Sequence, residues 1–306
     1  MPRQISLAEP AACSLAECLA ALGESGFDPA DEDSLMHAAS WLRRLGNDRA
    51  FLGDLLLERL ARSHRDAGQE SAYGPQVVML SPPGPVFLRA NIWPSRAERC
   101  LRASGGESFV YELPHDHNFD FLTLGYFGPG YWSDYWEEDY VALDGWRGEP
   151  AGLRYVERSR LHEGRLLHYR AHRDVHSQHP PDALSVSLNV MHASAAQGWL
   201  DQYRFDVETG TIAGILNEGS SEAFLRIGVG LGSDEALTLA ESFARSHPSD
   251  RMRLAAWDAW AGALDAEARD DLWRQAELSG SRMVAMEARA RREELEMAFP
   301  SRHPSS

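Results

Sequence analysis

Two groups of histidines in the middle of the sequence could bind a metal ion. The first is His115-Asp116-His117, and the second ends at His176. In a β-strand, residues i and i+2 point to the same face, so His115 and His117 can converge on one ion while Asp116 points away. Neutral imidazole suits iron, copper, nickel and zinc, and two imidazoles need only one or two further ligands to complete an open site. The spacing therefore predicts a metal site.

The third ligand could be His172 or His176, which lie four residues apart. On a helix this spacing would suit metal binding, but the flanking residues alternate as in a β-strand and predict a corner instead. We therefore favour His176. Asp120 is the nearest carboxylate after the first pair, and if it points inward we expect a fourth ligand or a base. The alternative is that these histidines are exposed or hydrogen-bonded strand residues without a metal.

A substrate could be bound by residues of two other segments. The run VFLRANIW at 86–93 alternates, with Phe87, Arg89 and Asn91 on one face. If that face lines the interior, the planar guanidinium of Arg89 suits a substrate carboxylate, and Asn189 is a second candidate. The alternative is an outward Arg89 beside a buried aliphatic face.

These residues lie in a zone of short β-rich runs between about Tyr73 and Asp206. Proline, glycine and aspartate separate the runs, which is typical of a sandwich or barrel. We interpret the aromatic and acidic stretch from Tyr126 to Asp139 as a packed loop. The predicted strands are 77–80, 86–93, 108–113, 119–127, 152–157, 165–169 and 184–191.

Helical periodicity flanks this zone on both sides. It covers Ser14 to about His64 and returns after Gly210, where helices are expected near 221–230, 234–246, 249–264, 266–278 and 282–298. The predicted organisation is an N-terminal helical segment at 1–72, a β-barrel at 73–209, a C-terminal helical region at 210–300 and a disordered tail at 301–306.

The order of the histidines resembles the two-part motif of the cupin superfamily. In that motif an HxH pair and a later histidine, after a strand that begins at glycine, meet inside a double-stranded β-helix. The corresponding residues here are His115, His117, Gly164 and His176. Within the superfamily, the segments Phe87–Trp93, Phe119–Gly125 and Ser185–Val190 resemble those of the cysteine dioxygenase-like thiol dioxygenases.

The resemblance implies an α+β protein with a cupin-type double-stranded β-helix, or jelly-roll barrel, flanked by helical segments. It also implies that His115, His117 and His176 bind Fe(II), with Ni, Zn, Mn or Cu as other divalent metals. It covers about 110 residues and leaves both helical zones outside it. A homodimer is a further expectation from the resemblance.

The sequence departs from these families at several positions. Cupins place a glutamate three or four residues after the HxH pair, whereas only Asp120 is near here. Thiol dioxygenases lack that carboxylate, but their alternating Ser, His and Tyr would fall on Ser187, Asn189 and Met191. Cysteine is therefore not the expected substrate.

Composition restricts the class of partner. The 306 residues are 43% apolar and 25% charged, as in a soluble globular protein. The net charge of −16 disfavours nucleic acid, and no apolar run reaches membrane-spanning length. The three cysteines lack CxxC spacing and are expected to be reduced. The N-terminus lacks the apolar core of a secretory signal, so we expect a cytoplasmic protein.

Together these features favour a mononuclear non-haem iron oxygenase, or dioxygenase, that acts on dioxygen and a small molecule such as an amino acid or related carboxylate. A metal-dependent isomerase, epimerase or lyase could use the same ligands with the ion as a Lewis acid. A non-catalytic binding or regulatory protein is the third hypothesis.

Overall fold

The computed structural model describes residues 1–63 and 76–298, so the predictions made for 64–72 and 301–306 lie outside the described residues. The chain forms two compact units. The first contains Met1–Tyr140 and Gly152–Val207, and the second contains Val141–Ala151 and Glu208–Ser306.

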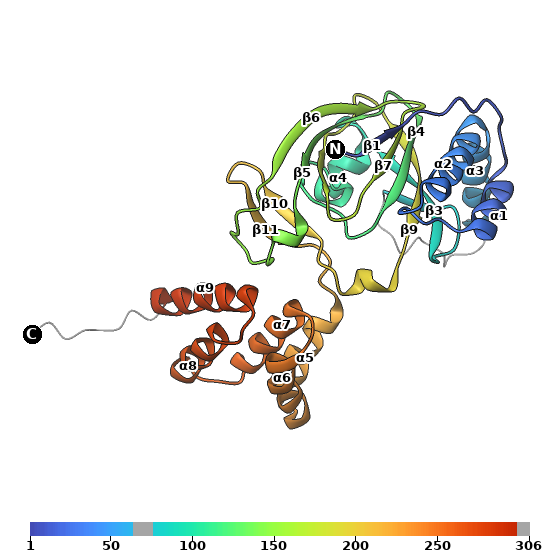
Figure 1. Ribbon diagram of the computed structural model, residues 1–306. Helices are drawn as coiled ribbons and strands as arrows, with labels where there is room; N and C mark the ends of the chain where they lie inside the picture. The colour runs from blue at the N-terminus through green and yellow to red at the C-terminus, as the bar shows by residue number, and fades with distance from the viewer. Residues whose placement is uncertain (64–75, 299–306) are drawn as a thin grey trace, which may run out of the picture. The chain divides into compact units, whose positions relative to one another are not determined.

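Two antiparallel sheets form the centre of the first unit (Figure 1). The larger sheet has the strand order β1-β7-β4-β9-β3-β2, and the smaller has the order β6-β5-β8. The strands are β1 (Arg3–Ile5), β2 (Val77–Met79), β3 (Val86–Trp93), β4 (Phe121–Phe127), β5 (Tyr131–Glu137), β6 (Arg154–Leu161), β7 (Leu166–Tyr169), β8 (Asp174–Gln178) and β9 (Ser185–His192).

Alternation along the strands gives the larger sheet two different faces. Leu88, Leu122 and Leu188 lie on the outer face, where they join an apolar core with the N-terminal helices. The inner face carries Phe121 and Tyr169, which belong to a separate aromatic core together with residues of the smaller sheet. The sheet therefore separates a helix-packed layer from an interior that holds the polar site described below.

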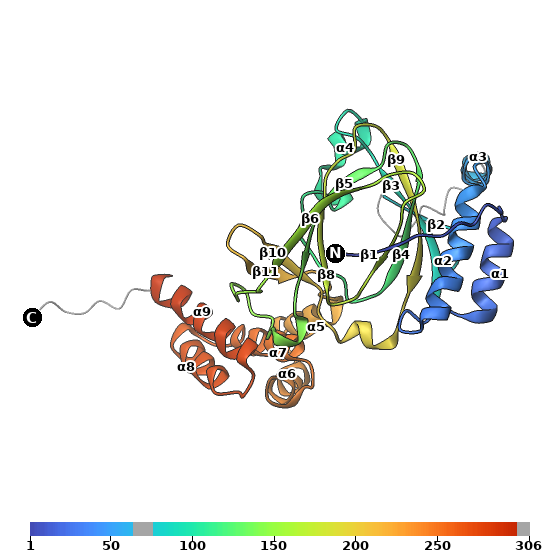
Figure 2. The same cartoon turned by 45° about the horizontal axis from the view of Figure 1, so that its top comes forward.

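Helices α1 (Leu15–Ser25), α2 (Glu32–Asn47) and α3 (Phe51–Ser63) cover the outer face of the larger sheet, as Figures 1 and 2 show. Ser14 and Glu17 form a capping box at the start of α1, and Asp31 caps α2. Gly46 allows α2 to approach β4 closely, since a Cβ there would lie 2.3 Å from Leu124 Cδ2.

The α+β class with antiparallel sheets is confirmed, but one predicted strand, one predicted loop and the expected closed barrel need correction. The described strands form two separate sheets and do not close into one hydrogen-bonded barrel. Residues 108–113 are not a strand: they follow the short helix α4 (Arg99–Ser104) and include a 3-10 turn at Glu107–Phe109. The stretch interpreted as a packed loop contains β5, whose alternate residues Tyr131, Ser133 and Tyr135 are buried.

Helices make up most of the second unit, and a hairpin spans the point at which the chain enters it from the first. Strands β10 (Tyr203–Asp206) and β11 (Thr211–Ile215) pair at the junction of the two units' sequences. The helices are α5 (Ser220–Gly230), α6 (Asp234–Ser246), α7 (Asp250–Ala261), α8 (Ala266–Glu277) and α9 (Arg282–Ala298). Their core is rich in alanine, with Trp257 and Trp273 as its largest buried side chains.

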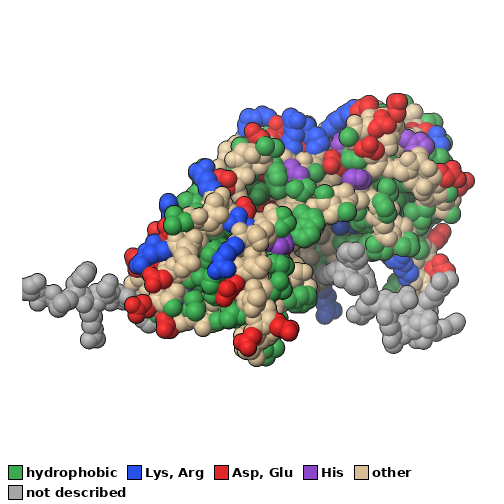
Figure 3. Space-filling model, turned by 60° about the horizontal axis from the view of Figure 1, so that its bottom comes forward, with side chains coloured by type: hydrophobic (Ala, Val, Ile, Leu, Met, Phe, Trp, Pro, Cys, Tyr) green, Lys and Arg blue, Asp and Glu red, His purple; other side chains and the backbone are tan. Residues whose placement is uncertain are grey.

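Acidic, basic and apolar side chains are interspersed over the face of the molecule drawn in Figure 3. Among the described helices, none combines the length and the hydropathy that a membrane span requires.

Candidate metal centre

Three buried imidazoles converge inside the first unit. His115, His117 and His176 are 4%, 7% and 2% exposed. Each offers a ligand atom, and these atoms all lie within 4.8 Å of one another. The Nε2 atoms of His115 and His176 are 3.3 Å apart. Of the histidines, cysteines and carboxylates that the structure describes, these are the ones grouped closely enough to hold an ion.

A pair of backbone hydrogen bonds brings His115 to His176. The amide of His115 donates to the carbonyl of His176 at 3.0 Å, and the amide of His176 donates back at 2.9 Å. His176 lies in the middle of β8, whereas His115 lies outside the named strands and forms two isolated bridges, to His176 and to Arg204. The i,i+2 argument assumed that the HxH pair lies in a strand of its own. Pairing with β8 positions it instead.

Asp116 anchors the segment between the two histidines. It is fully buried, and its Oδ1 accepts a hydrogen bond from the amide of Tyr203 at 2.5 Å. Its own amide donates to the carbonyl of Tyr203 at 3.2 Å, and its carbonyl accepts from Gln202 Nε2 at 2.8 Å. The side chain points away from the ligand atoms, as the sequence predicts, and ties the segment to the start of β10.

Further hydrogen bonds orient two of the imidazole rings. The Nδ1 of His115 lies 2.7 Å from the carbonyl oxygen of Leu113. The Nδ1 of His176 lies 3.2 Å from the hydroxyl of Tyr169, which lies 3.0 Å from the hydroxyl of Tyr135. When Nδ1 donates in each case, Nε2 carries the lone pair that a metal needs. The amide nitrogen of Gln178 lies 3.0 Å from Nε2 of His176, where it would give way to a metal.

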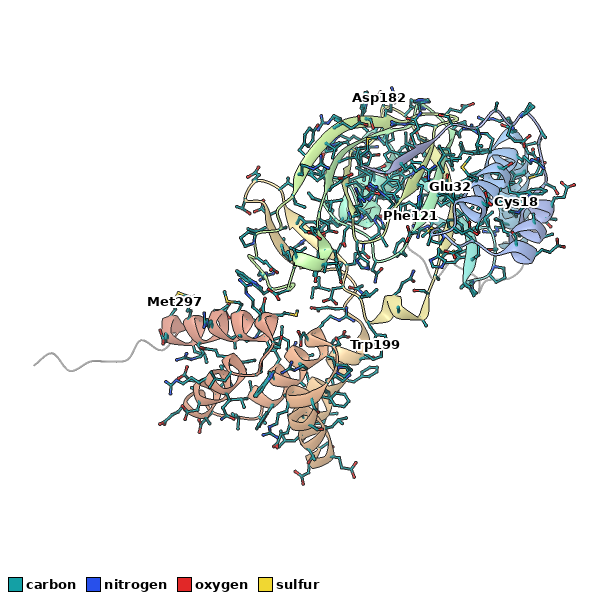
Figure 4. The ribbon with its side chains drawn as sticks, in the orientation of Figure 1. Cys18, Glu32, Phe121, Asp182, Trp199 and Met297 are labelled. Carbon is teal, nitrogen blue, oxygen red and sulfur yellow. The ribbon has the colours of Figure 1, made fainter. Side chains whose placement is uncertain are left out.

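Aromatic rings surround the third imidazole. The ring centroid of His117 is 4.9 Å from those of Phe119 and Phe121, and Phe121 stacks on Tyr169. Phe121 is labelled in Figure 4, inside the β-rich unit. The Nδ1 of His117 is buried without a hydrogen-bond partner. Apolar surroundings of this kind raise the free-energy cost of leaving the nitrogen without a hydrogen bond.

Burial keeps these imidazoles neutral. Desolvation lowers the pKa of His115, and it holds the pKa values of His117 and His176 well below the ordinary value. The neighbouring imidazoles add to the effect at His117 and His176, because two positive charges would repel each other. At neutral pH the three rings are therefore ready as electron-pair donors.

The donor set fits a divalent transition metal. Two nitrogens bound at about 2.1 Å to one tetrahedral or octahedral ion lie roughly 3.0–3.4 Å apart, which the His115–His176 separation matches. Three neutral nitrogens without a carboxylate suit iron, copper, nickel or zinc better than magnesium or calcium. The unpaired buried nitrogen of His117 is consistent with a missing partner.

Both candidate substrate-binding residues lie on the inner face of the larger sheet. Arg89 is directly opposite Asn189, and Asn189 is directly opposite Thr123 on the next strand. The positive charge of Arg89 contributes to the lowered pKa of His117, after burial and His115, so the guanidinium is near the histidines. Asn189 Nδ2 and Thr123 Oγ1 are buried without a hydrogen-bond partner. Arg89, Asn189 and Thr123 thus form a polar row that borders the histidine cluster.

The structure does not bring Asp120 to the histidine cluster. Its Oδ1 lies 3.1 Å from Nε2 of His168. His168 alternates with the inward-facing Leu167 and Tyr169, so it lies on the outer side of the sheet. Asp120 is therefore the partner of a different histidine.

His172 also lies apart from the cluster. It has a positive φ of 56°, at the corner that the sequence predicts, and its ring packs against that of Tyr140 at a tilt of 41°, with centroids 3.9 Å apart. Its Nδ1 is 3.9 Å from Oδ2 of Asp116, behind the HxH segment.

Sequence reasoning missed the residues that support the ligands. Tyr135, Tyr169 and Gln178 contact His176 or each other in the interior. The alternation of YWSDYWE at 131–137 was a signal for β5, but the preceding Gly-Pro-Gly and the acidic run favoured a loop. Asp116 was expected only to point away, since its partner is distant in the sequence.

No protein-family model and no curated protein matches this chain. Similar solved structures include the DMSP lyase DddQ from Ruegeria pomeroyi DSS-3, with 10% identity over 42% of this chain and 52% of that chain, at a TM-score of 0.25. This chain thus spans about half the length of that lyase. A cupin domain from Bordetella pertussis Tohama I has 12% identity over 41% of this chain and 100% of that chain, at a TM-score of 0.23. The CoII form of HppE with substrate has 13% identity over 58% of this chain and 97% of that chain, at a TM-score of 0.22. At these TM-scores the likenesses assign neither a family nor an activity.

Proposed function

We propose that this protein is a cupin-like metalloenzyme that binds one divalent metal through His115, His117 and His176 and oxidises a small molecule with dioxygen. The observation that carries the proposal is the convergence of three buried, neutral imidazoles beside a polar row. Fe(II) is the metal that we favour, with Ni, Zn, Mn and Cu as other divalent ions. Three nitrogen ligands leave open positions for a substrate, and bound Fe(II) would supply the oxygen chemistry.

The protein's own residues would bind and orient the substrate. Arg89 offers a planar guanidinium for a carboxylate, and Asn189 and Thr123 offer a buried donor and a hydroxyl on the neighbouring strands. Tyr169 and Tyr135 would fix the ring of His176 through its Nδ1. Phe119 and Phe121 would exclude water from the side of His117. Amino acids or related carboxylates are the substrate class that this arrangement favours.

A metal-dependent isomerase or lyase is the second candidate. Asp120 lies outside the cluster, so no carboxylate of the described residues completes the ligand set. The three histidines alone can also hold a metal that acts as a Lewis acid. A homodimer and a cytoplasmic location remain part of the proposal from the sequence.

Oxygen uptake tests the oxygenase proposal. The chelator-treated protein is loaded anaerobically with Fe(II), and uptake is recorded with a panel of amino acids and other small carboxylates. We expect uptake that depends on both Fe(II) and one member of the panel. Arg89→Gln should raise KM for that substrate about tenfold or more without loss of iron, because it removes a charge-assisted contact.

Arg158→Gln is the matched control, since Arg158 is an exposed arginine paired with Asp134. It should leave KM unchanged. Metal binding without oxygen uptake for any substrate would contradict the oxygenase and favour the isomerase or lyase.

A further inference from the structure

A second site of chemical interest is a pocket of about 520 Å³ that does not involve the three histidines. Its lining comes from β1 and the residues after it, from α2, and from the turn between β6 and β7. Ile5 and Leu166 form its apolar wall, and both belong to the layer between the larger sheet and the helices. The apolar wall of the pocket therefore lies on the helix-packed side of that sheet.

Basic side chains line this pocket, and acidic ones do not. Arg43, Arg165 and His162 are among its lining residues, whereas none of the described lining residues is Asp or Glu. In a chain with 46 acidic and 30 basic residues, a pocket with this composition is an exception. Its local potential is positive although the net charge is negative.

Arg43 is a half-buried cation without a counter-ion. Its guanidinium donates one hydrogen bond, to the carbonyl of Gly164, and its Nε is buried without a partner. No carboxylate of the described residues pairs with it, and burial lowers its pKa. A guanidinium has five N–H donors, so most of its hydrogen-bonding capacity is unused. An anion in the pocket would offset the cost of burying this charge.

Arg165 adds a second charge from the facing turn. Its side chain is 10% exposed, and its Nε is buried without a partner. Its Nη1 donates to the carbonyl of Arg160 at 2.8 Å. The nearest carboxylate oxygen is that of Glu157, 3.9 Å from Nη2, which is too long for a hydrogen bond. Two guanidinium groups thus line one pocket; Glu157 lies at the outer limit of an ion pair with Arg165, and Arg43 has no carboxylate partner among the described residues.

We propose that this pocket binds the phosphate group of a small phosphorylated molecule. A phosphate monoester carries about −1.5 to −2 charges at pH 7 and three acceptor oxygens, which match two guanidinium groups. A carboxylate carries one charge and two acceptor oxygens, so it would satisfy fewer of the unused N–H donors. The volume is in the range of small-ligand sites, so the organic part of the ester has room beside Ile5 and Leu166.

Isothermal titration of the full chain with phenyl phosphate and with benzoate tests the proposal, because the two probes share an aromatic ring and differ in the anionic group. We expect phenyl phosphate to bind at one site with a Kd of about 1 mM or tighter, and benzoate to bind at least about tenfold more weakly. Arg43→Gln and Arg165→Gln should each weaken phenyl phosphate about tenfold or more. Circular dichroism and thermal melting check that both variants fold.

Two controls separate this site from other arginines and from the histidines. Arg3→Gln changes a neighbouring arginine that is already paired with Glu32, and it should alter the Kd by less than about twofold. His176→Ala, in chelator-treated protein, should bind phenyl phosphate as the wild type does. The absence of saturable binding, equal binding of benzoate, wild-type affinity in folded Arg43→Gln and Arg165→Gln, or loss of binding in His176→Ala would each overturn the proposal.

Discussion

Among the described residues of the first unit, Glu138 has the carboxyl group whose pKa departs most from its ordinary value. The residue is 9% exposed, and both of its carboxyl oxygens and Oδ2 of Asp116 are buried without a hydrogen-bond partner. Burial, together with the neighbouring charge of Asp116, raises the pKa of Glu138 to about 10. Glu138 is therefore protonated at neutral pH, which relieves the repulsion behind the HxH segment.

Glu138→Gln tests this protonation state through stability. Because the folded pKa is raised, the contribution of neutral Glu138 is complete below the unfolded pKa and is lost as the pH rises toward about 10. In that window the carboxyl group ionises only in the unfolded state, which lowers the free energy of unfolding by about 1.4 kcal/mol per pH unit. Glutamine does not ionise, so the variant should gain stability over the wild type between pH 5 and pH 9. Urea unfolding at several pH values measures this, and parallel profiles for the two proteins would contradict it.

At the residue scale the sequence singled out the three histidines that the structure brings together, and it left the direction of Asp120 open. The i,i+2 rule needs only local geometry, and the order of the histidines along the chain indicated the third ligand, His176. Asp120 immediately precedes Phe121, which faces the interior, and alternation therefore turns Asp120 toward His168. The packing of the whole sheet decides which side of this strand faces the interior, and the residue types near Asp120 do not indicate that side.

At the element scale, the HxH segment is held by partners distant in the sequence. Its backbone bonds to His176 on β8 and to Tyr203 on β10, and Asp116 provides the second of these attachments. A segment of this kind owes its position to a few hydrogen bonds and not to a continuous ladder. Asp116 thus acts as a positioning residue for His115 and His117.

Asp116→Ala should weaken metal binding about 10-fold to 100-fold, because the ligands lose their support while all three histidines remain. Asp116→Asn keeps an acceptor for the amide of Tyr203 and should recover most of the affinity. Competition with a metal-binding dye gives the Kd values. The matched control is Asp120→Asn, which lies outside the cluster and should bind metal as the wild type does. A strong loss in the Asp120 variant alone would restore Asp120 as a ligand.

The turn between β4 and β5 depends on Gly130. Its φ is +77°, and a Cβ there would lie 1.9 Å from the carbonyl oxygen of Leu161. Gly130→Ala should therefore destabilise the protein by roughly 3 kcal/mol or more. Gly152→Ala is the control: its φ is +61°, but no atom lies within 4 Å of the added Cβ, so the cost should be about 1–2 kcal/mol. Equal losses in urea unfolding would show that the close contact is relieved by movement of Leu161.

Strong periodicity made some elements predictable. The strand at 86–93 and the helix at 234–246 have the predicted bounds, since alternation and the 3.6-residue period are local signals. The strands β1 and β8 were missed, because each is short and owes its assignment to pairing with a distant strand. The predicted strand at 108–113 is wrong, as positive φ values at Val110 and Glu112 break the extended conformation.

At the scale of the whole molecule, the chain crosses between its units. Residues 141–151 belong to the second unit although both flanking segments belong to the first. Glu149 closes this segment on itself by accepting hydrogen bonds from the amides of Asp144 and Gly145. Local periodicity contains no information about such an exchange, because it arises from contacts between residues far apart in the sequence.

The central claim is that one divalent metal binds to His115, His117 and His176. The most direct measurement is the metal content of three proteins, the wild type, His176→Ala and His172→Ala, after Fe(II) loading and removal of free metal. The wild type and His172→Ala should each retain about one ion per chain, because His172 packs against Tyr140 outside the cluster. His176→Ala should retain almost none. Equal retention by His176→Ala and the wild type, or loss in His172→Ala alone, would contradict the account.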